Sequence, residues 1–181
     1  MSETAEETLA RWQAEELTIR QRMPASNAPL RPELMAGRTG YEQIAAILSG
    51  EASPAPIGRT LDFILVHAEV GRAVFQGRPG PDHYNPMGSV HGGWFATLLD
   101  SALGCAVHTA MPAGKAYTTL ELKVNIVRAL TDKVPLVRAD GRTIHVGGQT
   151  ATADARLTGP DGKLYAHAST TCLVFDYPPK R

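Results

Sequence analysis

A histidine, two glycines and a carboxylate share one segment near the middle of this 181-residue chain. His91, Gly92 and Gly93 precede a stretch with helical spacing, and Asp100 follows about two turns further on. Glycines at a helix start leave backbone N–H groups open to a ligand oxygen, where the helix dipole favours negative charge. A carboxylate further along can act as base or nucleophile on the group that carries the oxygen. The segment therefore predicts carbonyl polarisation combined with acid–base or nucleophilic chemistry.

The helix that must position these groups is expected from Gly92 to about Thr109. Its apolar side chains recur at helical spacing and predict a broad stripe that packs against a sheet. The stripe consists of Trp94, Phe95, Leu98, Leu99, Ala102, Leu103, Ala106 and Val107. Asp100 lies off the stripe, on a face shared with Thr97, Ser101 and Gly104. Such a small, polar face is typical of a ligand cavity or a close subunit contact, so we favour a functional Asp100 over a solvated surface aspartate.

Strand-like segments flank this helix on both sides. Alternation begins at Leu61 and continues through a turn at Gly71 to a hairpin partner ending near Phe75. Four strand-like runs follow the helix, at residues 117–127, 134–145, 149–158 and 164–175. Turns alone can connect these four runs, which predicts antiparallel pairing of chain neighbours. A sheet of five or six strands with one long helix is an α+β domain.

The N-terminal part has a different character. Residues 4–22 predict a helix that lies on the body of the protein or on a neighbouring subunit, with recruitment of a partner as the alternative. Pro24, Pro29 and Pro32 then interrupt the chain, and residues 41–48 predict a short helix that Gly50 ends. We therefore expect a helical extension and linker at residues 1–52, a main domain at 53–176 and a tail at 177–181.

Bulk composition narrows the class of protein. Lys plus Arg and Asp plus Glu number 18 each, and this zero net charge argues against nucleic acid as a main partner. Cys105 and Cys172 lack metal-ligand spacing and are expected to be buried, reduced thiols. The N-terminus lacks signal-peptide features, and the most apolar stretch, residues 94–111, contains polar groups unsuited to a membrane span. The sequence thus predicts a cytoplasmic protein with no membrane or nucleic-acid partner.

The spacing of Asn85, His91-Gly92-Gly93 and Asp100, followed by the strand Thr119–Asn125, resembles the hotdog-fold acyl-CoA thioesterases. Within that family it is most similar to the phenylacetate-degradation (PaaI-like) branch, which is related to the 4-hydroxybenzoyl-CoA thioesterases. The resemblance covers residues 57–176. It implies the hotdog fold, a curled antiparallel sheet wrapped around one long α-helix. It also implies a homodimer with the active site at its interface, often paired into a homotetramer, an acyl-CoA substrate, and no cofactor because coenzyme A belongs to the substrate.

The resemblance further implies a role for each matching residue. The Gly92 N–H binds the thioester carbonyl oxygen, and Asp100 of the other subunit activates water or attacks directly. Thr119 helps to hold the water, while Asn85 and His91 shape the carbonyl pocket. Further substrate contacts are expected from Gly93, Met87, Trp94, Thr97, His145, Gly147, Gly148 and Phe63. No metal is expected, because a thioester is electrophilic enough without one and the chain carries neither paired histidines at metal spacing nor a Gly-x-Ser-x-Gly motif.

Two points stay open within this resemblance. Many relatives carry Arg or Lys in the turn between the last strands, where coenzyme A phosphates dock, whereas this chain has His145, Gly147 and Gly148 there, a pattern that also makes a good hairpin turn. The alternative phosphate contacts are Lys123, Arg128, Arg138 and Arg142. Glu121 is a rival acid–base group, since some related branches place the carboxylate differently, but we favour Asp100.

Three functions remain in competition. The favoured one is hydrolysis of an acyl-CoA with an aryl or medium-chain acyl group. A hydratase or dehydratase would instead need a carboxylate and a histidine facing each other over the acyl chain, and His91 starts the helix that carries Asp100. A non-catalytic acyl-CoA-binding module would use the N-terminal extension as its output. The sequence leaves open the acyl chain, the choice between base and nucleophile, and the choice between dimer and tetramer.

Overall fold

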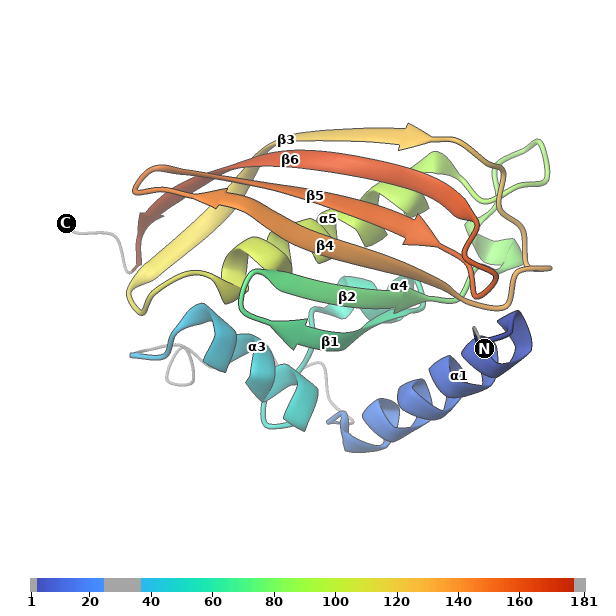
Figure 1. The fold of residues 1–181 in the computed structure, drawn as a ribbon, viewed down its shortest axis with the longest axis horizontal. Helices are drawn as coiled ribbons and strands as arrows, with labels where there is room; N and C mark the ends of the chain where they lie inside the picture. The colour runs from blue at the N-terminus through green and yellow to red at the C-terminus, as the bar shows by residue number, and fades with distance from the viewer. Residues whose placement is uncertain (1–2, 25–36, 178–181) are drawn as a thin grey trace.

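The computed structural model describes residues 3–24 and 37–177, so the expectations for Pro29, Pro32 and residues 178–181 lie outside the described residues. Within this part of the chain, one six-stranded antiparallel sheet curls around a single long helix, α5 (Figure 1). The strands are β1 (Phe63–Glu69), β2 (Arg72–Gly77), β3 (Lys115–Ile126), β4 (Val137–Val146), β5 (Thr150–Thr158) and β6 (Leu164–Asp176). The α-helices are α1 (Ala5–Arg22), α3 (Gly40–Ser49), α4 (Pro56–Thr60) and α5 (Gly92–Thr109), with a 3₁₀ turn at Pro81–His83.

The order of strands across the sheet is β1-β2-β4-β5-β6-β3, and this corrects one expectation. β3 does not pair with its chain neighbour β4 but runs antiparallel to β6, while β4 pairs with β2. The connection at residues 127–136 is too long for a hairpin turn, and it buries Leu130 and Leu136. These two side chains gain more from burial in the core than an exposed turn would give them, so the chain crosses to the far edge of the sheet.

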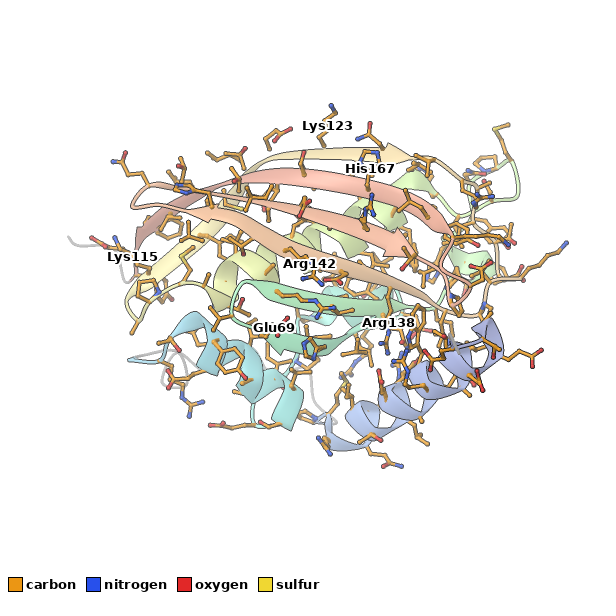
Figure 2. All side chains as sticks on the ribbon, in the orientation of Figure 1. Glu69, Lys115, Lys123, Arg138, Arg142 and His167 are labelled. Atoms are coloured by element: carbon orange, nitrogen blue, oxygen red, sulfur yellow. The ribbon has the colours of Figure 1, made fainter. Side chains whose placement is uncertain are left out.

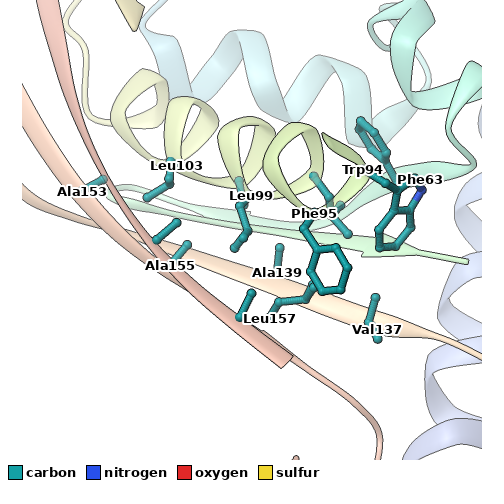
Figure 3. Close-up of a cluster of buried hydrophobic side chains, with 14 of the residues drawn as sticks. Phe63, Trp94, Phe95, Leu99, Leu103, Val137, Ala139, Ala153, Ala155 and Leu157 are labelled. Carbon is teal, nitrogen blue, oxygen red and sulfur yellow. The ribbon is translucent and has the colours of Figure 1, made fainter. Parts of the chain in front are cut away.

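The core forms between α5 and the concave face of the sheet. All eight residues of the predicted apolar stripe are buried, as Figure 3 shows for Trp94, Phe95, Leu99 and Leu103. The facing strands contribute small residues, and the registers place Ala73, Gly141, Ala155 and Ala168 in one row across β2, β4, β5 and β6. A Cβ at Gly141 would stand 2.4 Å from the Ala102 carbonyl oxygen. The helix therefore lies as close to the sheet as its backbone allows.

A bulge in β3 changes which side chains face the helix. The register of β3 against β6 shifts between Thr119 and Glu121. A bulge places two residues opposite one and breaks the strict alternation of faces. As a result Leu122 packs against the core, whereas Leu120 is 61% exposed. Leu120 and Leu122, although two residues apart, therefore lie on opposite faces of the sheet.

Helix α1 lies on the outer face of the sheet, as the first of the alternatives predicted. A capping box between Thr4 and Glu7 starts the helix. Its buried residues are Trp12, Glu16 and Ile19. The Gln76 amide donates to the Trp12 carbonyl oxygen (3.3 Å) and to the Glu16 carboxylate (2.7 Å). Because Phe75 packs with α5, the neighbouring Gln76 points to the opposite face, toward α1.

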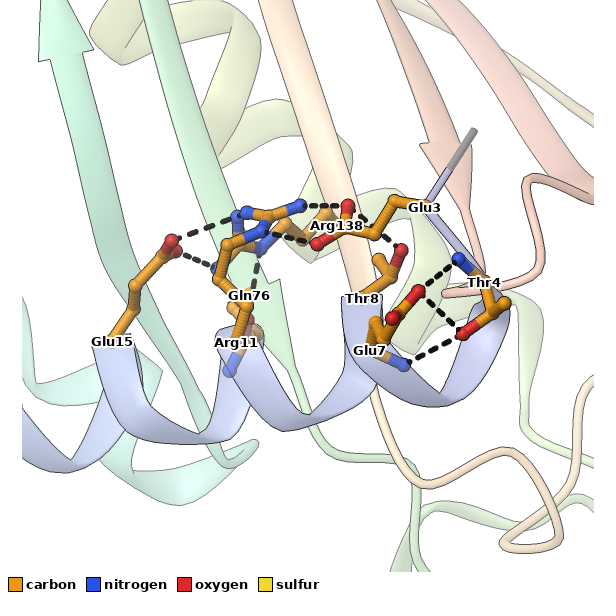
Figure 4. A network of polar contacts seen from close by, with 8 residues as sticks. All are labelled: Glu3, Thr4, Glu7, Thr8, Arg11, Glu15, Gln76 and Arg138. Atoms are coloured by element: carbon orange, nitrogen blue, oxygen red, sulfur yellow. Dashed lines mark hydrogen bonds and ion pairs between the residues drawn. The ribbon is translucent and has the colours of Figure 1, made fainter. Parts of the chain in front are cut away.

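Charged side chains hold α1 at this position (Figure 4). The Arg138 guanidinium of β4 lies 4.5 Å from the Trp12 ring centroid and also pairs with Glu15. Arg11 pairs in turn with Glu15 and with Glu3. The helix is therefore attached by a mixture of apolar burial and ion pairs, most of which are partly exposed to solvent.

Helix α3 packs against the C-terminal half of α5. Thr39 and Glu42 form its capping box, and Gly50 ends it with a φ of 82°, in the left-handed region that favours glycine. Ile44 packs in a second cluster with Leu65 and Ala106, among others. The extension thus shares an apolar cluster with the main domain. The predicted boundary between residues 52 and 53 stays a prediction.

Candidate active site

The start of α5 has the geometry that its residue types favour. His91 is the N-cap, and its Nδ1 accepts a hydrogen bond from the Gly93 N–H at 2.9 Å. The Gly93 N–H is therefore used within the chain, whereas the Gly92 N–H has no acceptor among the described residues. A Cβ at Gly92 would stand 3.3 Å from Ile126 Cδ1, so a side chain there would crowd the end of β3. One unsatisfied donor remains at the positive end of the α5 dipole.

Asp100 sits two turns further along α5 on the face away from the core. Its Oδ1 accepts a hydrogen bond from the Thr119 hydroxyl at 3.2 Å. The bulge in β3 allows this contact, because it keeps Thr119 on the helix side of the strand while Leu120 turns outward. Thr97 and Ser101 lie on the same face, and each hydroxyl donates to a carbonyl oxygen one turn earlier in α5. Asp100 is thus the one charged group on a face of small and polar residues.

A cavity of about 230 Å³ opens beside Asp100. Its lining is mostly apolar and comes from β1, β2, β3, α4 and α5 of the domain, from the two residues before Pro56, and from α3 of the extension. The residues that line it are Ile47, Pro54, Ala55, Ile57, Gly58, Phe63, Ile64, Leu65, Phe75, Asp100, Ser101, Cys105 and Tyr117. Of the expected pocket residues, Phe63 lines the cavity. The Asp100 carboxylate therefore lies on the wall of a mostly apolar cavity.

Burial sets the protonation of the groups in the cavity. It raises the pKa of Asp100, and the Thr119 hydrogen bond acts against that rise. Burial and the nearby Asp100 charge raise the pKa of Cys105 to about 12. The pKa of Tyr117 is raised well above its ordinary value, again chiefly by burial. Cys105 and Tyr117 are therefore neutral at physiological pH, and Asp100 is the group suited to accept a proton.

Three residues expected at the substrate have other surroundings in this chain. Met87 is 91% exposed and does not line the cavity. Trp94 is buried in the core, where its Nε1 donates to the Leu61 carbonyl oxygen and its ring stacks on His83. The Asn85 carboxamide oxygen accepts from the Met87 and Ser89 backbone N–H groups, so it holds its own loop together. The apolar character that suggested Met87 and Trp94 as pocket residues does not distinguish pocket, core and surface.

The glycine hairpin lies apart from Asp100 within one chain. Gly147 donates its N–H to the Thr150 carbonyl oxygen and so closes the turn between β4 and β5. The registers align Val146 with Thr119 across three strand spacings. At about 4.8 Å per spacing this amounts to roughly 14 Å. His145, Gly147 and Gly148, which were expected at the substrate, therefore lie apart from Asp100 within one chain.

Of the four basic residues considered as alternative phosphate contacts, two form ion pairs with carboxylates of the described residues and two do not. Arg138 is occupied by Trp12 and Glu15, and Arg142 pairs with Asp140. Figure 2 shows Lys123 projecting from the edge strand β3, and no ion pair of the described residues involves it. Arg128 donates only to a backbone carbonyl, that of Leu164, at 3.4 Å. Lys123 and Arg128 are the two that remain open to a phosphate.

The sequence did not reveal several residues that line the cavity, but it did favour Asp100 over its rival, Glu121. Glu121 is exposed and does not line the cavity, so the structure favours Asp100 within one chain. Tyr117, Cys105, Ile47 and Ile57 were missed. Tyr117 was accessible to reasoning, because it lies two residues before Thr119 and so shares its face. Ile47 and Ile57 were not, because their contact with the cavity depends on how α3 and α4 pack.

Distance along the helix separates the two halves of the proposed chemistry. Gly92 and Asp100 are eight residues apart on α5, which at 1.5 Å per residue is about 12 Å. A carbonyl oxygen hydrogen-bonded to the Gly92 N–H lies about 3 Å from it and cannot also bring its carbon within reach of Asp100. Gly92 and Asp100 of one chain are thus too far apart for one carbonyl group to contact both directly.

A curled antiparallel sheet around one long helix, with the carboxylate on the helix, defines a hotdog-fold protein. The family model described as the thioesterase superfamily matches residues 87–166, which include the helix start, Asp100 and Thr119. This segment of the chain is therefore similar to the thioesterase superfamily.

Three proteins with similar sequences are described as esterases or as a hydrolase. A candidate esterase of Pseudomonas aeruginosa is 34% identical over 92 residues, which are 50% of this chain and 62% of the relative. A candidate esterase of Halobacterium salinarum is 32% identical and matched over 52% of its length, so the chain spans between half and two thirds of these two proteins. The 1,4-dihydroxy-2-naphthoyl-CoA hydrolase of Listeria monocytogenes is 25% identical over 64% of this chain and 92% of the relative.

Solved structures show the same fold. A candidate thioesterase of Ralstonia eutropha, described as related to phenylacetic acid degradation, superposes with a TM-score of 0.65 at 26% identity, covering 71% of this chain and 97% of that one. The Escherichia coli PaaI protein gives a TM-score of 0.59 at 20% identity, covering 65% and 83%, and this likeness concerns the fold alone. PaaI-type proteins are thus among the structural neighbours.

Two further features concern residues 3–24 and 37–177, namely the length of their apolar helices and the grouping of side chains that could bind a metal. None of the helices there is long and apolar enough to cross a membrane. Nor does that part of the chain bring three His, Cys, Asp or Glu side chains together in a way that would hold a metal ion.

Proposed function

We propose that this protein hydrolyses an acyl-CoA thioester to the free acid and coenzyme A. The observation that carries the proposal is the Asp100 carboxylate, hydrogen-bonded by Thr119, on the wall of an apolar cavity, within a segment that matches the thioesterase superfamily model. The hydrolase activity named for the Listeria relative supports the same reaction class. An aryl or medium-chain acyl group and the PaaI-like branch are part of the proposal, supported by the PaaI-type structural neighbours.

The proposed site lies between two subunits. The spacing of about 12 Å between Gly92 and Asp100 along α5 supports a site in which the Gly92 of one chain and the Asp100 of another act on the same carbonyl. A two-fold dimer brings Gly92 of one subunit toward Asp100 of its partner and creates two such sites. The homodimer is therefore required by this mechanism, while a dimer of dimers and a cytoplasmic location stay predictions.

The chemistry follows from the groups present. The Asp100 carboxylate removes a proton from a water that Thr119 helps to position, and the hydroxide oxygen adds to the thioester carbon. The Gly92 N–H donates to the oxyanion that forms, and the helix dipole adds to its stabilisation. Collapse of the tetrahedral intermediate breaks the carbon–sulfur bond and releases the thiolate of coenzyme A, which then takes a proton. Direct attack by Asp100 would give an anhydride that water hydrolyses, with the same products.

The test is release of free thiol from a panel of acyl-CoA substrates. Asp100→Asn is expected to lower kcat by about 10²-fold or more, since proton transfer by a positioned side chain contributes 10²–10⁴-fold. Asp154→Asn is the matched control, because it makes the same change at an exposed position of β5. No thiol from any substrate would refute the activity, and an unchanged rate in Asp100→Asn would refute the role of that residue.

Subunit mixing tests the shared site separately. Gly92→Pro removes the N–H at the first position of a helix, where proline is tolerated. Gly92→Pro and Asp100→Asn should each be inactive alone, yet their heterodimer should regain one intact site from the Gly92 of one chain and the Asp100 of the other. Mixtures that stay inactive although heterodimers form would refute a site shared between subunits.

The hydratase alternative gains no support within the chain. Its chemistry needs a histidine facing the carboxylate, and no histidine lines the cavity beside Asp100. His91 uses its Nδ1 to cap its own helix. Incubation with an enoyl-CoA distinguishes the two reactions, since hydration removes the conjugated absorbance without releasing thiol.

A further inference from the structure

Most of the lining of the cavity beside Asp100 comes from outside the segment that matches the superfamily model. That match begins at residue 87. Five lining residues come from α3, from α4 and from the two residues before Pro56, namely Ile47, Pro54, Ala55, Ile57 and Gly58. The rest of the lining comes from β1, β2, α5 and β3 and includes Phe63, Leu65 and Asp100. The α3 and α4 region therefore forms part of the cavity wall, and Ile47 is the lining residue that comes from the extension at residues 1–52.

The packing of α3 fixes this wall in place. A Cβ at Gly40 would stand 1.7 Å from the His108 carbonyl oxygen, so α3 lies directly against the backbone of α5. The Gly40 N–H also donates to the Met111 carbonyl oxygen at 2.9 Å. Further along, His108 Nε2 and Gln43 Oε1 lie 2.9 Å apart. An apolar cluster and three close polar and backbone contacts thus hold α3, and the wall it forms is rigid.

The cavity also ends within one turn or two of Asp100. Cys105 and Tyr117 line it, whereas Gly104 and His108 do not. A Cβ at Gly104 would stand 2.6 Å from the Tyr117 hydroxyl, and the Tyr117 ring meets the His108 ring edge-on at 5.6 Å. Tyr117 therefore covers the rest of this helix face and closes the cavity toward the C-terminal end of α5.

We propose that α3 and α4 set the size limit of the acyl group, and that this cavity takes a single aromatic ring or an alkyl group of similar bulk while excluding long chains. This inference rests on the proposed thioesterase function. The cavity measures about 230 Å³. An apolar cavity of about 150 Å³ holds benzene, so the space admits one ring with a short substituent. The lining offers no fixed charge beyond Asp100 and so matches an uncharged acyl group.

The test changes the volume at Ile47 in the full-length protein and measures kcat/KM across acetyl-, butyryl-, hexanoyl-, phenylacetyl-, decanoyl- and palmitoyl-CoA. The wild type should prefer hexanoyl- and phenylacetyl-CoA over palmitoyl-CoA by about 10-fold or more, since one methylene in an apolar pocket changes kcat/KM 10- to 200-fold. Ile47→Ala should shift the optimum toward decanoyl-CoA. Ile47→Phe should lower kcat/KM for hexanoyl- and phenylacetyl-CoA by about 10-fold while sparing acetyl-CoA.

Matched variants separate a wall effect from a general one. Leu17 is 61% exposed on α1, so Leu17→Ala and Leu17→Phe make similar changes in size away from the cavity and should leave the profile unchanged. Ile57 lines the cavity but is 48% exposed, so Ile57→Ala widens the cavity with little risk to folding. It should move the optimum in the same direction as Ile47→Ala.

The outcomes also separate this inference from the proposed function. No turnover of any acyl-CoA by the wild type would refute the proposed function, and the size limit with it. Turnover with equal kcat/KM for palmitoyl- and hexanoyl-CoA, or an acyl profile that neither Ile47→Phe nor Ile57→Ala alters, would overturn the size limit while leaving the hydrolase intact.

Discussion

Gly141→Ala should destabilise the protein by forcing α5 away from the sheet. Gly141 lies in the row of small residues that faces the helix, and a Cβ there would stand 2.4 Å from the Ala102 carbonyl oxygen. Ordinary contact begins at 3.4 Å, so strand and helix must separate by about 1 Å. Overpacking of this kind costs about 1–3 kcal/mol, and the upper value applies because the obstacle is backbone rather than a flexible side chain.

The unfolded chain partly offsets this cost. Alanine restricts the unfolded backbone more than glycine and returns about 0.4–1 kcal/mol, which leaves a net loss of about 2 kcal/mol. For a chain of this size that loss corresponds to a fall in Tm of about 4–8 °C. Because Ala102 is two residues from Asp100, a 1 Å shift should also lower kcat/KM, by up to about 10²-fold.

Thermal unfolding followed by circular dichroism measures the effect on stability. The control is Gly148→Ala in the β4–β5 hairpin, where a Cβ meets nothing within 4 Å. It carries the same change in the unfolded chain without the steric conflict, so its Tm should stay equal or rise slightly. If Gly141→Ala has the same Tm as Gly148→Ala, the conclusion that α5 packs against β4 too closely for a side chain at Gly141 is refuted.

Three further predictions concern charge. The pKa of Asp100 is raised and catalysis needs its carboxylate, so kcat/KM should fall as the pH drops through a value above 3.8. Thr119→Val removes the hydrogen bond that lowers this pKa and should move the fall in kcat/KM to higher pH. Thr118→Val, at the exposed neighbouring residue, should leave the pH profile unchanged. Burial of the Asp100 charge also costs stability above its folded pKa, so Asp100→Asn should raise Tm at pH 7, and urea titrations should show the gain fading as the pH falls to the unfolded value. Burial disfavours the ionised Glu16 carboxylate, but its hydrogen bonds to Arg20 and Gln76 outweigh this effect and lower its pKa. Glu16→Gln should therefore lower the free energy of unfolding by about 2 kcal/mol above pH 4.5, and this loss should disappear on acidification. The control Glu6→Gln, at an exposed position, should show no such loss.

The local elements could be predicted from the sequence because their signals are local. The spacing of Trp94 through Val107 gave the buried stripe of α5, and Gly50 and Gly71 marked a helix end and a turn that the structure has. The small residues around Asp100 indicated a face distinct from the apolar stripe, and Asp100 and Ser101 on this face line the cavity. Each of these features depends on residues within one or two turns of each other.

The sequence by itself therefore determined the strands, the helices α1 and α3, the α+β class and the helix that carries His91, Gly92 and Asp100, but not α4. Tertiary structure decided which strand pairs with β3, that a bulge turns Thr119 toward Asp100 and Leu120 to solvent, and that Ile47 closes the cavity. It also placed Trp94 in the core and Met87 in solvent. The physical reason is that periodicity and capping act over a few residues, whereas strand order, bulges and cavity walls depend on which distant apolar surfaces bury one another.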